Sequence, residues 1–415
     1  MGDSIEPLER VDQCVVIVGA GLAGVRVAEG VRGAGFPGRI LLIGEETHLP
    51  YDRPPLSKAV LQVDGHEHTI GLSPEGAMAG LNIELKLGQR AVSIARDARE
   101  LVLADGERVA YDRLVLATGS RVRMLDLLPA GAPGVHYMRG LDDALALRAG
   151  LIPGARVAIV GGGVIGLEVA ASARARGCAV SVVEAGERVM ARAASAPISQ
   201  FMESRHVREG VALYMGTTVS GAEFQHGGPI SLLLSDGGVL EADVVVVGVG
   251  VSANLDLALG SGLDVRTDGI VVDGLGATSD PAIYAAGEVA VHFNDAYGRH
   301  DRQENWAHAA AHGEHVGQAL AAPTAAYRQI ASYWTDQYDI NLQVFGAPIG
   351  ETDVVRGDPA SGKFLVFHLI GGRIEGVSAV NALRELRAAK RLIGAAQPAD
   401  LEALANPAVD LAALT

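Results

Sequence analysis

Short, unbroken apolar runs that end in glycine are the clearest pattern along the chain. The first run, residues 15–18, has the length and composition of a strand buried on both faces of a parallel sheet. It leads directly into a turn at 19–24 and then into a helical stretch that stops at Gly33. A second apolar run at 40–43 leads to Glu45. This order predicts a βαβ unit with a glycine-rich turn before its helix.

Each glycine of this turn has a separate physical role. Gly19 allows the tight turn, Gly21 lets backbone N–H groups approach a pyrophosphate, and Gly24 lets the helix pack close to the strand. The helix N-terminus adds unpaired N–H donors and partial positive charge. Glu45 follows the second strand, where an acidic side chain takes the hydroxyls of an adenosine ribose. The unit is therefore predicted to bind a dinucleotide.

The same pattern occurs a second time. An apolar run at 157–160 leads into the glycine turn 161–166 and an alanine-rich helix, and a run at 180–183 then leads to Glu184. Two fingerprints imply two dinucleotides, and the economical interpretation is a flavoprotein reductase with FAD at one site and a nicotinamide at the other. A carboxylate hydrogen-bonds a ribose 2′-OH and repels a 2′-phosphate. Glu184 therefore predicts NADH rather than NADPH, with Arg188 close enough to soften that preference.

The segments after each fingerprint also repeat, which indicates an internal duplication. Residues 81–112 alternate polar and apolar, as antiparallel strands do, and precede a buried run at 114–119. A similar alternating stretch precedes the apolar run 244–250. From Tyr333 onward, strands followed by helices predict a last α+β domain. The predicted fold class is α/β, with two Rossmann-like dinucleotide-binding domains and a C-terminal α+β domain.

Composition narrows the classes of function. At 415 residues the chain is long enough for two or three domains. No apolar run reaches the roughly 18–20 residues of a membrane helix. Residues 1–13 are polar and acidic, which predicts a loose tail rather than a signal peptide, and hence a cytoplasmic protein. The net charge of −15 argues against nucleic acid as a partner.

The cysteines and histidines exclude further chemistry. Disulfide reductases pass electrons from flavin to two closely spaced thiols, whereas Cys14 and Cys178 each stand at the start of a predicted strand. Electrons would then leave the flavin directly, to oxygen, a quinone or a protein redox centre. His308, His312 and His315 share one face of a predicted helix. Without cysteines or a carboxylate network beside them, we expect a solvated or cofactor-facing surface and no metal site.

Several longer strings resemble one family. They are Leu-Pro-Tyr-Asp-Arg-Pro-Pro-Leu-Ser-Lys at 49–58, Ala-Thr-Gly at 117–119, the turn at 163–168, Trp-Thr-Asp-Gln at 334–337 and Ala-Ala-Lys-Arg-Leu at 388–392. With them the chain resembles, over nearly its whole length, the oxygenase-coupled, FAD-containing NADH:ferredoxin reductases of the glutathione-reductase fold. The resemblance implies a three-layer architecture with an FAD-binding domain (1–117 and 246–325), an NAD-binding domain (118–245) and a C-terminal α+β domain (326–415).

The resemblance also assigns site residues. Lys58 and Glu168 would be the catalytic residues, paired where nicotinamide stacks on flavin. The residues expected to hold FAD are Gly19, Gly21, Leu22, Ala23, Gly24, Glu45, Arg53, Lys58, Ala117, Thr118, Gly119, Gly287, Glu288, Glu304, Asn305, Trp306 and Trp334. Those expected to hold NADH are Gly161, Gly163, Val164, Ile165, Gly166, Glu168 and Glu184. Glu288 is a departure, since the family has an aspartate there that holds a ribityl hydroxyl.

The implied reaction is hydride transfer from NADH to FAD, followed by single-electron transfer to a [2Fe–2S] ferredoxin that feeds a ring-hydroxylating dioxygenase or a cytochrome P450. Arg384, Arg387 and Arg391 would share one helix face, a candidate contact for an acidic ferredoxin. Two alternatives stay open. One is an NADH oxidase or quinone reductase, and the other is a flavin-bound redox-sensing interaction protein. Whether the chain is a monomer or a homodimer is also open.

Overall fold

Both glycine turns belong to parallel five-stranded sheets in the computed structural model, which describes residues 8–74, 76–294, 298–394 and 399–414. The chain divides into two compact units. Unit 1 contains the described residues of 1–52, 68–121 and 251–330, and unit 2 contains those of 53–67, 122–250 and 331–415. The division into three domains stays a prediction. Within the described ranges, no helix combines the length and the apolar character needed to cross a membrane.

The sheet of unit 1 has the first glycine-turn strand at its centre. Its strands run parallel in the order β19-β7-β1-β2-β3. They are β1 (Cys14–Val18), β2 (Arg39–Ile43), β3 (Ile83–Lys86), β7 (Arg113–Leu116) and β19 (Ile283–Ala285). The last four residues of β1 are buried, as expected for a strand covered on both faces. The prediction of antiparallel strands was wrong for β3, which pairs parallel with β2, because alternation alone does not distinguish the two kinds of pairing.

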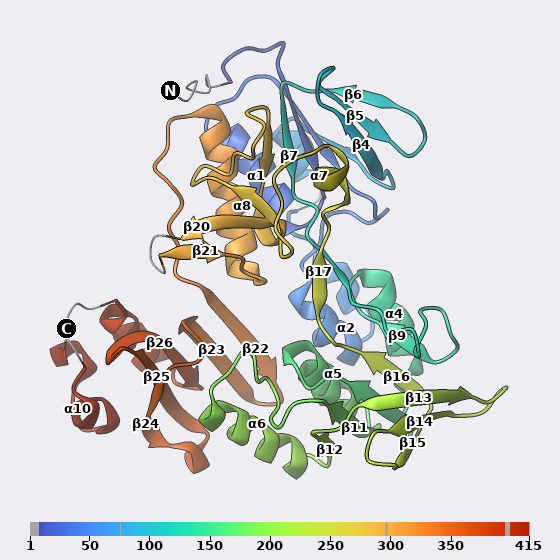
Figure 1. Ribbon diagram of the computed structural model, residues 1–415, viewed down its shortest axis with the longest axis vertical. Coiled ribbons are helices and arrows are strands. Elements are labelled where there is room, and N and C mark those ends of the chain that lie inside the picture. The colour runs from blue at the N-terminus through green and yellow to red at the C-terminus, as the bar shows by residue number, and fades with distance from the viewer. Residues whose placement is uncertain (1–7, 75, 295–297, 395–398, 415) are drawn as a thin grey trace. The chain divides into compact units, whose positions relative to one another are not determined.

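Helices cover one face of this sheet and an antiparallel sheet covers the other. The helices α1 (Leu22–Gly33) and α8 (Trp306–Ala321) lie side by side (Figure 1), and glycine allows their close contact, since a Cβ at Gly317 would lie 2.3 Å from the Val27 carbonyl oxygen. The opposite core contains residues of β4 (Ala91–Ala95), β5 (Glu100–Leu103) and β6 (Arg108–Ala110). These layers match the predicted three-layer architecture. In the predicted tail, Leu8 is buried against the helical layer, and residues 1–7 lie outside the described part.

Smaller elements complete unit 1. A three-stranded sheet has the order β18-β20-β21, and the chain passes between the units in β8 and β17. The bounds are α3 (Ala77–Gly80), β8 (Ser120–Val122), β17 (Val251–Ala253), α7 (Asp256–Gly260), β18 (Ile270–Val272), η3 (Gly287–Val289), β20 (Ala290–Asn294) and β21 (Arg299–Asp301). The short η2 (His66–Thr69) also lies where the chain changes units.

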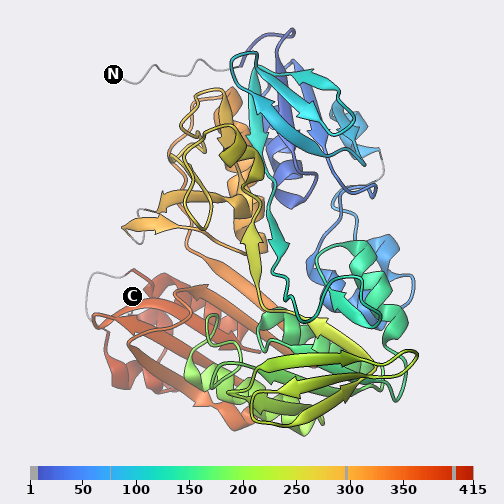
Figure 2. The ribbon, with the colours of Figure 1, turned by 45° about the vertical axis from the view of Figure 1, so that its right-hand side comes forward.

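The parallel sheet of unit 2 repeats the construction of the first. Its order is β12-β11-β10-β16-β9, so β10 and β16 pair as β1 and β7 do, which confirms the predicted duplication. The bounds are η1 (Pro54–Ser57), α2 (Ala59–Gln62), β9 (Val135–Tyr137), α4 (Leu141–Gly150), β10 (Arg156–Val160), α5 (Val164–Ala175), β11 (Ala179–Glu184), α6 (Ala196–Arg208), β12 (Ala212–Met215) and β16 (Val244–Val247). A separate antiparallel sheet, yellow-green in Figure 2, contains β13 (Val219–Phe224), β14 (Ile230–Leu234) and β15 (Val239–Ala242).

The last part of unit 2 is the predicted α+β region. An antiparallel sheet, orange to red in Figures 1 and 2, has the order β22-β23-β26-β25-β24. The bounds are β22 (Ser332–Gln337), β23 (Ile340–Gly346), β24 (Thr352–Asp358), η4 (Pro359–Ser361), β25 (Lys363–Ile370), β26 (Arg373–Val380), α9 (Leu383–Ala389), η5 (Lys390–Leu392), α10 (Leu401–Ala405) and η6 (Leu411–Leu414). This sheet shares a buried core with α5 and α6, so β22 lies next to the helix that carries Glu168.

Candidate functional site

The first glycine turn is closed toward the protein and open on its outer side. A Cβ at Gly19, whose φ is +114°, would lie 2.2 Å from the Ala117 carbonyl oxygen, and one at Gly24 would lie 1.9 Å from the Gly19 carbonyl oxygen. Gly21, the N-cap of α1, has no atom within 4 Å of its added Cβ. Among the described residues no side chain caps the helix, so its first N–H groups are available to a phosphate. This geometry fits the pyrophosphate of a dinucleotide.

Other residues expected to hold FAD lie around the same turn. The 117–119 loop follows β7, and Asn254 holds it by accepting a hydrogen bond from the Thr118 hydroxyl (3.0 Å) and donating one to the Thr118 carbonyl (2.8 Å). Gly287 lies against Ala23 of α1, where a Cβ would approach the Ala23 Cβ to 2.5 Å. Glu45 is exposed, and its carboxylate is 3.8 Å from Arg90 Nε. Its predicted bond to a ribose stays a prediction.

The start of α8 is held by a set of polar contacts. Asn305 caps the helix by accepting the His308 N–H at 2.8 Å, and Trp306 Nε1 donates to Asp52 at 2.6 Å. Arg302 donates to the Glu288 carbonyl at 2.7 Å and forms ion pairs with the carboxylates of Glu288 and Glu304. The longer Glu288 side chain is therefore engaged by Arg302, and its contact with a ribityl hydroxyl stays a prediction.

The second glycine turn, in unit 2, has the same form. A Cβ at Gly161 would lie 2.4 Å from the Gly248 carbonyl oxygen, and one at Gly166 would lie 2.1 Å from the Gly161 carbonyl oxygen. Gly163 is open like Gly21, and α5, whose first residues are Val164 and the half-exposed Ile165, has no side-chain cap from the part of the chain that the structure describes. This turn also fits a pyrophosphate. Unlike Glu45, Glu184 is fixed in place, because its carboxylate accepts the N–H groups of Gly162 (2.6 Å) and Gly186 (2.7 Å).

The predicted pair of Lys58 and Glu168 is present in unit 2. Lys58 Nζ lies 2.8 Å from Glu168 Oε1 and 3.1 Å from the Pro54 carbonyl oxygen. The Glu168 side chain is 2% exposed and that of Lys58 is 18% exposed, so the ammonium is the part of the pair that reaches the surface of the unit. Thr335 donates to Glu168 Oε1 at 2.6 Å and Ser57 donates to Oε2. A carboxylate buried without partners would be strongly destabilising. Lys58 and the two hydroxyls offset the charge of Glu168 and so allow its burial.

Comparison with known proteins decides the family. The family model described as pyridine nucleotide-disulphide oxidoreductase matches residues 13–313, and a model described as reductase C-terminal matches 332–415. The chain belongs to the pyridine nucleotide-disulphide oxidoreductase family. Membership confirms the predicted fold class and the cofactors FAD and NADH. The geometry of each of the two turns described above fits a dinucleotide pyrophosphate.

Individual relatives and solved structures show which members of the family the oxidoreductase is similar to. It is 44% identical, over 95% of its chain and 98% of the relative, to the ferredoxin–NAD(+) reductase component of the anthranilate 1,2-dioxygenase system of Burkholderia cepacia. It is 38% identical to putidaredoxin reductase of Pseudomonas putida, over 96% of its chain and 95% of the relative. Its fold matches the putidaredoxin reductase in the covalent complex with putidaredoxin, with a TM-score of 0.93, 37% identity and 98% of each chain covered. The predicted resemblance is thereby confirmed.

The histidine face of α8 in the oxidoreductase differs from the expectation. His308 and His312 are completely buried rather than solvated, and they stack with His292 of β20, with ring centroids 4.9–5.5 Å apart. In the part of the chain that the structure describes, no group of three or more His, Cys, Asp or Glu side chains is arranged to hold a metal ion. Burial lowers the pKa of His308 to about 3 and that of His312 well below its ordinary value, so both are neutral. His312 Nδ1 then accepts the Gly287 N–H at 3.0 Å and supports the turn against Ala23.

Two other residues expected to hold FAD, Arg53 and Trp334, belong to unit 2. Arg53 of the proline-rich loop donates to the Arg139 carbonyl oxygen in unit 2. Trp334 is half-buried in β22, where it pairs with Gln343 of β23 and precedes Thr335. Sequence reasoning missed Ser57 and Thr335 as partners of Glu168. Ser57 and Thr335 lie next to Lys58 and Trp334, inside two of the sequence strings that carry the family resemblance. That position was the one feature of the sequence that could have indicated their role.

Proposed function

We propose that the protein is an NADH:ferredoxin reductase, which accepts electrons from NADH and passes them singly to a [2Fe–2S] ferredoxin of a ring-hydroxylating dioxygenase or cytochrome P450 system. The observation that carries the proposal is the enclosed Lys58–Glu168 pair, in which Glu168 stands two residues beyond the last glycine of the second fingerprint. Relatives named as ferredoxin–NAD(+) reductase components of dioxygenase systems support it.

The residues of the site would act by positioning and by charge. Bound FAD would supply the conversion between a two-electron donor and a one-electron acceptor. The Lys58 ammonium would favour the electron-rich reduced flavin electrostatically, and Glu168 would hold that ammonium in place. The helix N-terminus at Gly21 would take the FAD pyrophosphate, and that at Gly163 the NADH pyrophosphate. Glu184, already fixed by two backbone N–H groups, would accept the ribose hydroxyls of NADH.

The thiols of the chain support direct electron transfer from the flavin. Cys14 and Cys178 are free in the described part of the chain, and each stands at or next to the start of its own parallel strand. Burial raises the pKa of both thiols, so neither provides a thiolate at neutral pH. A dithiol relay of the disulfide-reductase kind therefore has no residues to use here.

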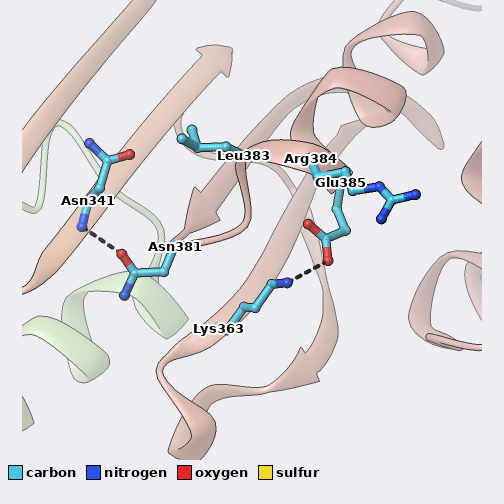
Figure 3. Close-up of a pocket in the computed structure, with 6 residues that line it drawn as sticks. All are labelled: Asn341, Lys363, Asn381, Leu383, Arg384 and Glu385. Atoms are coloured by element: carbon cyan, nitrogen blue, oxygen red, sulfur yellow. Dashed lines mark hydrogen bonds and ion pairs between the residues drawn. The ribbon is translucent and has the colours of Figure 1, made fainter.

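A basic surface near the end of the chain supports ferredoxin as the acceptor. Arg384, Arg387 and Arg391 are exposed on α9 and η5. A pocket of about 300 Å³ lies at the start of α9, and in it Lys363 pairs with Glu385 at 3.0 Å. Arg384 extends away from that pair (Figure 3). Cations grouped on a chain of net charge −15 favour contact with an acidic protein. We propose this surface as part of the ferredoxin contact.

The test compares NADH-dependent cytochrome c reduction with and without added [2Fe–2S] ferredoxin. Strong dependence on ferredoxin, together with anaerobic bleaching of the flavin by NADH, supports the reductase. Rapid oxygen or quinone reduction without ferredoxin would instead select the oxidase or quinone reductase. Very slow reduction of every acceptor would select the redox-sensing interaction protein. Fractionation of the source cells would test the cytoplasmic location, which is part of the proposal.

A further inference from the structure

A line of hydrogen bonds in unit 2 leads from Glu168 to a tyrosine at the end of β22. Gln337 Nε2 is 3.1 Å from the Thr335 hydroxyl, which itself contacts Glu168. Gln337 Oε1 is 2.8 Å from His206 Nε2, and His206 Nδ1 is 3.0 Å from the Tyr338 hydroxyl. The side chains of Thr335, Gln337 and His206 are at most 1% exposed. The line thus joins β22 and α6 to the carboxylate on α5.

The donors of this line all point toward Glu168. The Thr335 hydroxyl donates to the Glu168 carboxylate and accepts from the Gln337 amide. The amide oxygen of Gln337 then accepts from His206, which fixes the proton on Nε2 and leaves Nδ1 to accept from Tyr338. Hydrogen bonds in one direction strengthen one another in a region of low dielectric constant. Every member of the line therefore adds to the stabilisation of the same carboxylate.

The surroundings of His206 maintain this sequence of donors and acceptors. Burial is the main cause that lowers the pKa of His206, and Arg205 lowers it further, while the Gln337 bond and Glu209 act in the opposite direction. A neutral imidazole has one donor and one acceptor, as the line requires. Burial also raises the pKa of Tyr338, so its phenol remains a donor. Arg205 lies over the Tyr338 ring at 5.1 Å and pairs with Asp339 at 2.6 Å.

We propose that Gln337 and His206 are positioning residues of flavin reduction, which act through Thr335 to hold the Glu168 carboxylate, and with it the Lys58 ammonium, in one orientation. This inference rests on the proposed function, because it assigns a role within hydride transfer. It adds to that function two residues that touch neither Lys58 nor a nucleotide turn. Thr335 and Gln337 share one face of β22, so the strand presents both to the carboxylate side.

The first test observes Lys58 directly in the full-length holoenzyme. The chain has four lysines, Lys58, Lys86, Lys363 and Lys390, so the ammonium groups of [¹⁵N]lysine-labelled protein give few signals, and the Lys58→Met variant assigns the one of interest. We expect a sharp, exchange-protected Lys58 signal in the wild type. Gln337→Met and His206→Leu should broaden or shift it, whereas His206→Gln, whose amide can replace Nε2–H, should restore it.

The second test follows anaerobic flavin reduction by NADH in a stopped-flow instrument across pH. Loss of a hydrogen bond that serves a charged group should slow reduction by about tenfold in Gln337→Met and move the acid limb of the pH–rate profile to higher pH. The Kd of NADH should stay within about twofold, since the nucleotide turn is untouched. Gln225→Met, the same substitution at an exposed glutamine of unit 2, is the control and should match the wild type.

A double-mutant comparison separates positioning from general damage to the fold. In a Glu168→Gln background, Gln337→Met should have no further effect on the rate, because the carboxylate that it serves is gone. An undiminished effect in that background, or a Gln337→Met protein with the wild-type Lys58 signal and pH profile, would overturn the inference. Failure of NADH to reduce the wild-type flavin would instead overturn the proposed function, and the inference with it.

Discussion

Acid pH should destabilise unit 1 through its buried histidines. His308, whose pKa is about 3, stays neutral in the folded protein down to that pH, while the unfolded chain binds a proton near pH 6.5. The unfolded state therefore holds more protons between pH 6.5 and 3, and stability falls as the pH falls through this window. At pH 5.0, 1.5 pH units below the unfolded value, His308 alone costs about 2 kcal/mol relative to pH 7.5. His292 and His312 act in the same direction.

Urea unfolding at several pH values between 7.5 and 5.0 measures this loss. Trp306, two residues before His308, reports on unit 1 by fluorescence once Trp334 is replaced by phenylalanine. In that background the His308→Asn variant, whose amide can still donate to Tyr327, should lose about 2 kcal/mol less than the parent between pH 7.5 and 5.0. His300→Asn, at an exposed histidine of β21, is the matched control and should follow the parent.

Equal losses in the parent and His308→Asn would refute the reasoning, since the stack would then not resist protonation. The outcome also bears on the cofactor site. His312 Nδ1 accepts the Gly287 N–H and can do so as a neutral ring, so the stack supports the turn that lies against Ala23. Acid that protonates His312 would remove this support, and FAD release should accompany the loss of stability.

Four further predictions concern the nucleotide sites and the ferredoxin surface. Gly21→Ala should fold but lose at least about tenfold in FAD affinity, measured by flavin fluorescence, because its Cβ meets no protein atom and projects where the phosphate would lie. Gly24→Ala should fail to fold by circular dichroism, because its Cβ would lie 1.9 Å from a carbonyl oxygen. Glu184→Ala should raise the ratio of kcat/KM for NADPH to that for NADH by about tenfold or more, and a wild type that prefers NADPH would contradict this interpretation. Arg387→Glu should slow reduction of ferredoxin and leave ferricyanide reduction intact, so equal losses in both assays would argue against the docking surface.

The parts of the site that depend on backbone geometry could be predicted from the local sequence. The glycine turns could be predicted because their three glycines fall within six residues, and the clash of a Gly24 Cβ with the Gly19 carbonyl oxygen lies inside that window. The atom that a Gly19 Cβ would meet belongs to Ala117, far along the chain. The Lys58–Glu168 pair was predicted from the family resemblance, since 110 positions separate the two residues and no local pattern joins them.

Parts of the site that depend on packing between distant segments could not be predicted. The 3.6-residue period placed His308 and His312 on one face of α8, but which face is buried depends on His292 of β20 and on Tyr327, which lie elsewhere in the chain. His206 likewise meets Gln337 because α6 packs on the C-terminal sheet. Serine, threonine and glutamine are common on protein surfaces, so these residue types alone did not predict a buried hydrogen-bond network.

The two halves of the duplication share the glycine turn and the glutamate near the end of the second strand, but they differ in how that glutamate is held. Glu184 is held by two backbone N–H groups before any ligand arrives, so it loses little side-chain freedom when a ribose binds. Glu45 is 72% exposed with a distant partner in Arg90, and binding must order it. Preorganisation benefits a ligand that binds and leaves in every turnover, whereas a resident cofactor is ordered once. This difference supports the proposal that NADH binds at the second turn and FAD at the first.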